Sequence, residues 1–177
     1  MKSMDNSIVV QQATKADVLP IAQILSQSWR AAFKELFSSD ELTQIASEKR
    51  FCFILENVLS CDKGHLRMAL RGGDPAGEIF WLSGQQNIDA EIVSLFVLPQ
   101  AWGQGVGKQL LLQAEKEIQA ERDNELIELW TFQKNVHAQN FYERMGYTCS
   151  KRMRKSEFGG LLEVQYIKNV KVQGIKI

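Results

Sequence analysis

The chain has 177 residues, of which 45% are hydrophobic and 24% are charged. This length and composition fit one globular domain over residues 1–177, with its core at about 8–170, and exclude a disordered or fibrous class. Lys plus Arg and Asp plus Glu number 21 each, so charge gives no reason to expect nucleic acid or an anionic membrane surface as a partner.

The first half of the chain predicts strands and helices in alternation. Periodicity predicts, in order, a strand over 7–12, a helix over 16–32, a helical segment over 39–59, and two antiparallel strands over 66–71 and 78–82. The helical segment is expected to break near Ala46 and Ser47. The residues from Gly72 to Pro75 predict the turn between the two strands.

The second half predicts two strands joined by a helix, followed by a helix and a last strand. The expected elements are a strand over 90–98, a helix after a glycine-rich turn, a strand over 126–132, a helix over 136–145 ended by Gly146, and a strand over 161–167. Because a helix connects the strands 90–98 and 126–132, we expect these two to run parallel.

The glycine-rich turn has Gly103, Gly105 and Gly107 at alternate positions before its helix. Glycine lets the backbone lie close to a ligand, and the free N–H groups of a new helix bind anions such as phosphate. The spacing matches neither a dinucleotide-binding fingerprint nor a P-loop. Two interpretations follow: a site for a ligand that carries a pyrophosphate, or a tight loop without a ligand.

A second motif lies in residues 125–147 and has the pattern N-x-x-A-x-x-F-Y-x-x-x-G-Y, with Asn135, Ala138, Phe141, Tyr142, Gly146 and Tyr147. Taken with the earlier G-x-G-x-G turn, it resembles the GNAT superfamily of acyl-CoA-dependent N-acyltransferases. The resemblance implies an α/β (α+β) fold with a single mixed, mostly antiparallel sheet and helices on both faces. It also implies a splayed parallel strand pair whose gap takes the pantetheine arm.

The resemblance further implies acetyl-CoA as cosubstrate, without a metal. Its pyrophosphate would be held by the backbone of Gly103, Gln104, Gly105, Val106, Gly107 and Lys108. The backbone of Phe96, Val97 and Leu98 would pair with the pantetheine amides and polarise the thioester carbonyl. Lys108 either adds a charge to this site or is an exposed helix residue, and Asn135 either caps its helix or also binds the cofactor arm.

Trp102 departs from the family pattern, which usually has Gln or Arg at this position. Most of the expected anion binding comes from backbone donors, so a tryptophan at this position removes one side-chain contact to the cofactor and leaves the anion site intact. Trp102 itself would pack beside the cofactor or cover the helix.

Tyr142 is the candidate acid, because a phenol can donate a proton to a departing thiolate. An amine with a pKa of about 10 is protonated at pH 7, so a base is needed as well. Asp89 and Glu91 share one face of their strand and are the candidates, with solvent-facing charges as the alternative. His137 occupies a motif position whose residue varies in the family, and His65 is expected at the surface.

Three cysteines, Cys52, Cys61 and Cys149, are widely spaced and odd in number, so no disulfide framework or Cys-x-x-Cys metal site is expected. Cys149 is expected to be a structural thiol. The first residues lack the pattern of a signal peptide, and no apolar run approaches the roughly 20 residues that span a bilayer. We expect a cytoplasmic protein that binds no nucleic acid and no membrane.

The leading functional hypothesis is an enzyme, an N-acetyltransferase that moves an acetyl group from acetyl-CoA to a primary amine of a small molecule or a protein or peptide N-terminus. The transfer would be a direct attack in a ternary complex. The alternative is a regulatory module that binds acyl-CoA without turnover. Phe33, Leu36 and Phe37 line an acceptor pocket or belong to the core, and residues 168–177 form either an edge strand of a homodimer or a frayed tail.

Overall fold

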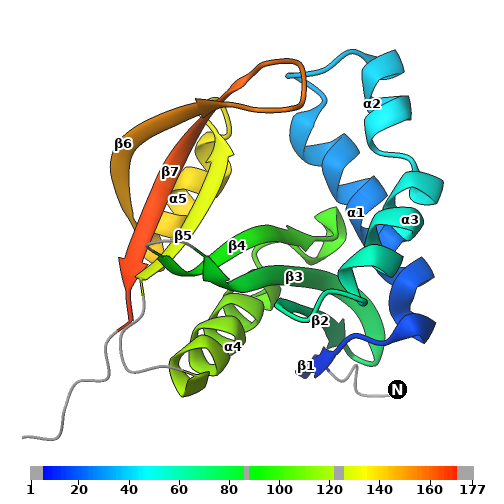
Figure 1. Ribbon diagram of the computed structural model, residues 1–177. Helices are drawn as coiled ribbons and strands as arrows, with labels where there is room; N and C mark the ends of the chain where they lie inside the picture. The colour runs from blue at the N-terminus through cyan, green and yellow to red at the C-terminus, as the bar shows by residue number, and fades with distance from the viewer. Residues whose placement is uncertain (1–5, 86–87, 122–125, 171–177) are drawn as a thin grey trace, which may run out of the picture.

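The computed structural model describes residues 6–85, 88–121 and 126–170, without the side chains of Gln85, Ile88 and Asp89. The order of elements in Figure 1 is β1 (Ile8–Gln12), α1 (Val18–Phe33), α2 (Ser39–Ile45), α3 (Glu48–Val58), β2 (Gly64–Arg71), β3 (Asp74–Gln85), β4 (Ile88–Val97), α4 (Val106–Glu121), β5 (Leu126–Phe132), α5 (Val136–Arg144), β6 (Thr148–Lys155) and β7 (Leu162–Asn169). The break predicted in the segment 39–59 is confirmed, since Ser47 caps the start of α3 with its side chain.

The strands form one seven-stranded sheet in the order β1-β2-β3-β4-β5-β7-β6. The pair β4 and β5 is parallel and the other neighbours are antiparallel, which confirms the predicted mixed sheet. Residues 90–92 of β4 pair with 127–129 of β5, and beyond them the two strands separate. In Figure 1, β5, β6 and β7 rise at a steep angle from β1 to β4.

A bulge in β4 marks the point of separation. Phe80 of β3 pairs with Ser94, whereas the next residue, Trp81, pairs with Ile92, so Val93 is the additional residue. Such a bulge bends a strand and increases its twist. Here it turns β4 away from β5 and opens the sheet directly after Ile92.

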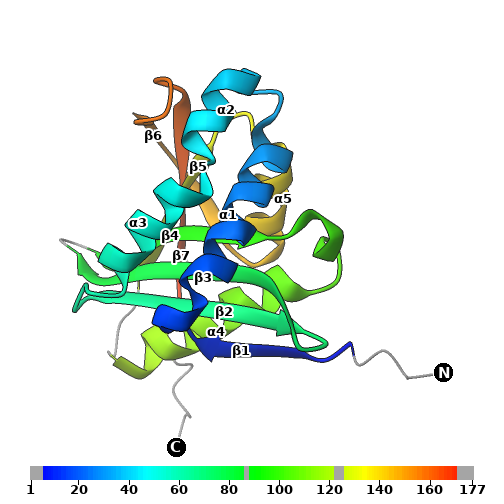
Figure 2. The same cartoon turned by 90° about the vertical axis from the view of Figure 1, so that its right-hand side faces the viewer.

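Helices cover both faces of the sheet, as predicted. One cluster of buried side chains joins α1, α2 and α3 to one face, and a second joins α4 and α5 to the other. Figure 2 shows α1 and α3 on the side of the sheet opposite to α4. The two clusters stabilise the sheet from both sides, and the gap between β4 and β5 lies between them. No helix in the described ranges is long and apolar enough to cross a membrane.

The structure corrects three predictions about elements. The strand β6 was missed, because its sequence TCSKRMRK is polar and its side chains are mostly exposed at the sheet edge. The strand β3 begins at Asp74, so the turn after β2 contains Gly72 and Gly73 alone. Residues 168–169 belong to β7, which lies between β5 and β6 and is not an edge; residues 171–177 lie outside the described residues.

Candidate active site

A cavity of about 150 Å³ lies where β4 and β5 separate. Residues 92–96 of β4 and 130–132 of β5 form two of its walls, and side chains from α1 and α5 close it from the two sides of the sheet. The cavity therefore passes from the face covered by α1 to the face covered by α5. Asn135 and Tyr142 of the second motif line this cavity. The glycine-rich turn adds no residue to the lining but packs against α5, since a Cβ at Gly107 would lie 3.6 Å from the Phe141 ring.

The glycine-rich turn has the geometry expected of an anion site. Gly103 and Gly105 have φ values of 72° and 88°, in the left-handed region that favours glycine. The amide of Gln109 donates to the Gly105 carbonyl at 3.0 Å, as the first turn of α4 forms. The amides of the preceding residues in this turn have no partner within the helix, so they are oriented to bind an anion. The chain from Gly103 to Lys108 thus fits a pyrophosphate.

The backbone groups at the end of β4 already have hydrogen-bond partners within the protein. The Val97 carbonyl accepts from Trp102 Nε1 at 2.7 Å and from Ser28 Oγ at 3.0 Å, which uses both of its lone pairs. Leu98 donates to the Ala76 carbonyl at 2.9 Å and accepts from the amide of residue 101 at 2.8 Å. Of the three predicted strand-end residues, Phe96 lines the cavity, while a ligand at the Val97 carbonyl or at Leu98 would have to exchange these bonds.

Trp102 holds the end of β4 through the hydrogen bond to the Val97 carbonyl, a role that the sequence did not indicate. Its ring also stacks on His137, with centroids 5.7 Å apart. The side chain is 41% exposed, so it covers this corner of the molecule beside the glycine-rich turn.

Asn135 and Tyr142 lie at the two ends of α5 and both line the cavity. The side-chain oxygen of Asn135 accepts from the Ala138 amide at 3.2 Å, so it is the N-cap of α5. Burial raises the pKa of the Tyr142 phenol well above its usual value, and the nearby carboxyl of Glu78 raises it further. Tyr142 therefore keeps its proton at neutral pH and can donate it.

Glu91 lies among other charged side chains beside the cavity. Burial raises the pKa of Glu91, Arg154 lowers it, and Glu128 and Glu163 raise it. Arg154 Nη1 is 3.8 Å from Glu91, and Arg154 Nε donates to Glu163 at 2.7 Å. The other predicted base, Asp89, has its backbone in β4, but its side chain lies outside the described residues.

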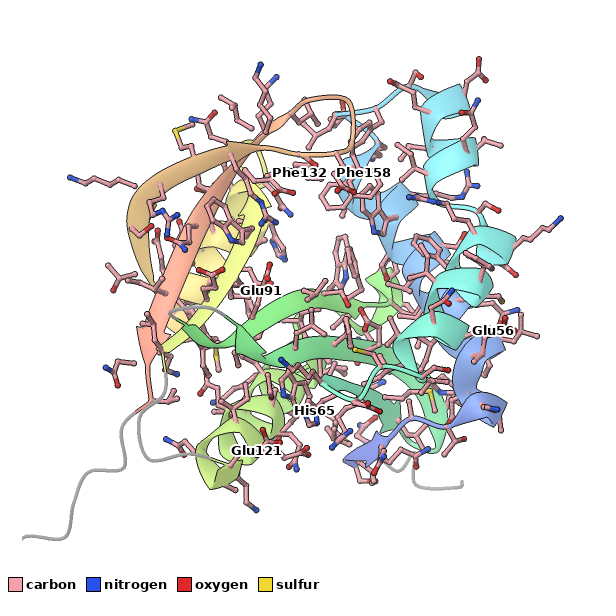
Figure 3. All side chains as sticks on the ribbon, viewed as in Figure 1. Glu56, His65, Glu91, Glu121, Phe132 and Phe158 are labelled. Atoms are coloured by element: carbon pink, nitrogen blue, oxygen red, sulfur yellow. The ribbon has the colours of Figure 1, made fainter. Side chains whose placement is uncertain are left out.

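Aromatic side chains form the wall of the cavity that faces α1. Trp29 is at their centre, with its ring centroid 4.7 Å from Phe33 and 4.9 Å from Phe158, and Phe33 is 5.0 Å from Phe132. Phe33 and Phe37 belong to the core cluster on this face, Leu36 packs against it, and Phe33 also lines the cavity. The acceptor pocket at these residues stays a prediction. Figure 3 shows Phe132 and Phe158 above Glu91, across the opening of the sheet.

Several cavity or rim residues were missed by the sequence analysis. Ser94 comes from the bulge in β4, Trp130 from β5, Arg154 from β6 and Glu163 from β7. The guanidinium of Arg154 lies 4.4 Å from the centroid of the Trp130 ring. No local motif signals them, because strand register in the folded sheet brings them together.

The histidines and Cys149 lie elsewhere. His65 of β2 stacks on Trp81 with centroids 5.0 Å apart, and the ring of His137 stacks on Trp102. Cys149 of β6 packs against the core beneath α4 and α5, in agreement with a structural thiol. Among the described residues, the cavity lining includes none of these three.

Comparison with known proteins identifies relatives of this arrangement. The model of the family described as Acetyltransferase (GNAT) family matches residues 21–147. A protein of Archaeoglobus fulgidus named an uncharacterized N-acetyltransferase is 33% identical over 108 residues, which are 58% of this chain and 69% of that protein. The aminoalkylphosphonate N-acetyltransferase of Salmonella typhimurium is 43% identical over 91 residues, 49% of this chain and 58% of that protein.

The fold also matches solved structures. The crystal structure of the PaiA N-acetyltransferase of Thermoplasma acidophilum, in complex with coenzyme A, superposes with a TM-score of 0.71. The match covers 90% of this chain and 98% of that protein at 18% sequence identity. At this identity the likeness concerns the fold, and it agrees with the sheet and helix arrangement described above.

Proposed function

The chain belongs to the acetyltransferase (GNAT) family and is an acetyltransferase, and from this premise we propose that it transfers an acetyl group from acetyl-CoA to a primary amine by direct attack in a ternary complex. The observation that carries the proposal is the buried phenol of Tyr142 in the wall of the cavity where β4 and β5 separate. The glycine-rich turn packs against the same helix, α5, since a Cβ at Gly107 would lie 3.6 Å from the Phe141 ring.

Acetyl-CoA, when bound, supplies the acetyl thioester. The amides from Gly103 to Lys108 would hold its pyrophosphate, because they precede the first complete turn of α4. The open strand edge at Phe96 would orient its pantetheine arm, and Asn135 borders the same cavity. The gap in the sheet fixes this arm relative to Tyr142, which lowers the entropic cost of bringing the reacting groups together.

Tyr142 is the proposed acid. Its raised pKa keeps the phenol protonated until the thiolate leaves, when the phenol donates its proton to sulfur. The new amide nitrogen gives up a proton in turn, which restores the phenol. One further proton must leave the ammonium before it attacks, and Glu91 and Asp89 remain the predicted candidates for its acceptor.

The acceptor is proposed to be an amine attached to an apolar or aromatic group. The aromatic wall of Trp29, Phe33 and Phe158 would bury such a group and favours it by the hydrophobic effect. Arg154 pairs with Glu91 and Glu163 near the opening, and Glu128 adds a third carboxylate beside Glu91, so the negative charge of this group attracts an ammonium. A small amine and the N-terminus of a peptide both meet these requirements.

The test combines a binding titration with a turnover assay. Calorimetric titration with acetyl-CoA measures the first step, and release of the CoA thiol measures turnover with amines whose side groups run from short alkyl to aromatic. Binding with release that rises with apolar side groups supports the proposal. Binding without release on any amine favours the acyl-CoA-binding regulatory module, and an absence of binding contradicts both.

A further inference from the structure

Glu78 of β3 is a buried acid for which neither motif accounts. Its exposed fraction is 0%, and its Oε1 has no hydrogen-bond partner among the described residues. A buried polar atom without a partner is costly and is therefore uncommon in folded proteins. The burial of this carboxyl group is explained if Glu78 serves as the proton acceptor that the reaction requires.

Ser94 connects this acid to the active-site cavity. Its hydroxyl donates to Glu78 Oε2 at 3.1 Å, and the same residue lines the cavity next to the bulge at Val93. The side chain of Glu78 therefore ends at the place where β4 turns away from β5. One hydroxyl separates the buried carboxyl from the space proposed for the acceptor amine.

We propose that Ser94 and Glu78 form a proton relay that removes the proton from the acceptor ammonium. The ammonium donates a proton to Ser94 Oγ while the Ser94 hydroxyl proton moves to Glu78 Oε2. The products of this step are a neutral amine, an intact serine and a protonated Glu78, so atoms and charge balance. The proton later returns to solvent by the reverse path after the acetylated product leaves. The relay rests on the proposed function.

The surroundings of Glu78 make it a stronger base than an exposed carboxylate. Burial raises the pKa of Glu78 from 4.5 to about 8, although hydrogen bonds from Ser94 and the Phe96 amide lower it. Proton transfer from an ammonium of pKa about 10 is then unfavourable by about 100-fold, whereas transfer to an ordinary carboxylate would be unfavourable by about 10⁵-fold. The ionised form increases as the pH rises through about 8, so turnover should rise over the same interval.

Few other charges face Glu78. On α5 the facing titratable group is Tyr142, whose pKa the carboxylate raises. On β4 the neighbours are the Ser94 hydroxyl and the Phe96 amide, and the buried residues of α1 include no titratable side chain. Protonation of Glu78 removes its effect on Tyr142 and makes the phenol a better acid. The relay thus prepares Tyr142 for the step that follows.

With Glu78 as the proton acceptor, Glu91 is no longer needed as the base and has a different role. It lies beside the opening, within 3.8 Å of Arg154, and is suited to attract the ammonium and hold it. Loss of the Glu91 carboxylate should therefore raise KM for the amine and leave the pH dependence of kcat unchanged. Loss of the Glu78 carboxylate should lower kcat and abolish its rise near pH 8.

The experiment measures kcat and kcat/KM for the amine from about pH 6 to 9, across the pKa values of the relay. The variants are Glu78→Gln, Ser94→Ala, Ser94→Thr and Glu91→Gln, each first checked for thermal stability and acetyl-CoA binding. We expect Glu78→Gln and Ser94→Ala to lower kcat by about 100-fold or more and to remove the rise, because general-base catalysis contributes about 10²–10⁴-fold. Ser94→Thr keeps a hydroxyl and should restore both.

Glu115→Gln is the matched control, since Glu115 is a buried acid that binds Lys168 outside the cavity. It should keep the wild-type pH profile. A wild-type rise in kcat in folded Glu78→Gln, or full activity of Ser94→Ala, would overturn the relay while leaving the acetyltransferase intact. If Glu78→Gln does not fold, the serine variants test the relay: low kcat in Ser94→Ala with restored kcat in Ser94→Thr supports it, and full activity of Ser94→Ala contradicts it. A wild-type protein that releases no thiol would instead contradict the proposed function.

Discussion

Replacing Gly105 by valine should abolish acetyl-CoA binding while leaving the protein folded. Gly105 has a φ of 88°, where a residue with a Cβ costs about 1–2 kcal/mol. A Cβ at this position would meet Ile8 Cδ1 at 3.8 Å, an ordinary contact, so the protein itself has room for it. The added side chain would instead prevent close approach of a ligand to the amides at the start of α4.

Gly73→Val is the matched control for this variant. Gly73, in the turn between β2 and β3, has a φ of 93°, and a Cβ there would meet nothing within 4 Å. A valine at this position therefore carries a similar backbone strain without entering the glycine-rich turn. Denaturant unfolding of both variants should show a loss of about 1–2 kcal/mol from the backbone conformation. Calorimetry should show acetyl-CoA binding in Gly73→Val and none in Gly105→Val.

Two results would refute this reasoning. Wild-type affinity in Gly105→Val would place the pyrophosphate away from the glycine-rich turn. An equal loss of affinity in Gly73→Val would show that backbone strain outside the glycine-rich turn, rather than access to the amides, decides binding.

Three further changes should have distinct effects. Tyr142→Phe should keep acetyl-CoA affinity in calorimetry and lower kcat by about 10²–10⁴-fold, and unchanged turnover would remove Tyr142 from its proposed role. Arg154→Met should raise the pKa of Glu91, because Arg154 lowers it, so an NMR titration should show Glu91 protonated to higher pH; a lower pKa would contradict the ion pair between the two side chains. Lys168→Met leaves the buried Glu115 without its cation and should cost up to about 3–5 kcal/mol in denaturant unfolding, and an unchanged free energy of unfolding would contradict this role of the pair.

The sequence was informative where function depends on consecutive residues. The turn at Gly103 and Gly105 could be predicted from its alternating glycines, and its interpretation as a ligand site depended on the second motif around Asn135 and Tyr142. Asn135 and Tyr142 could be predicted because the segment around them resembles a known motif. Their local conformations follow from short-range rules, namely positive φ at glycine and side-chain capping of a helix.

The acceptor side of the site could not be predicted in the same way. Phe158 and Arg154 come from the region around β6, a strand that lacks the alternation of a half-buried strand because it is a polar edge. The pair of Ser94 and Glu78 depends on the register of β3 and β4, in which Glu78 lies opposite Phe96 and Ser94 lies opposite Phe80. Neither the bulge nor the pairing of distant strands leaves a local pattern in the sequence.

Some predictions stay predictions. The cytoplasmic location and the homodimer rest on the sequence alone, and Asp89 has no described side chain. The roles assigned to Phe96 and Lys108 depend on a bound ligand and stay predictions, whereas the Glu91→Gln variant tests the role of Glu91.

The most direct test of the account is mass-spectrometric detection of the acetylated amine after incubation of the wild-type protein with acetyl-CoA and an arylalkylamine. The account predicts one acetylated amine for each CoA thiol released, with formation of both lost in Gly105→Val. Thiol release without an acetylated amine would show thioester hydrolysis and contradict the proposed transfer.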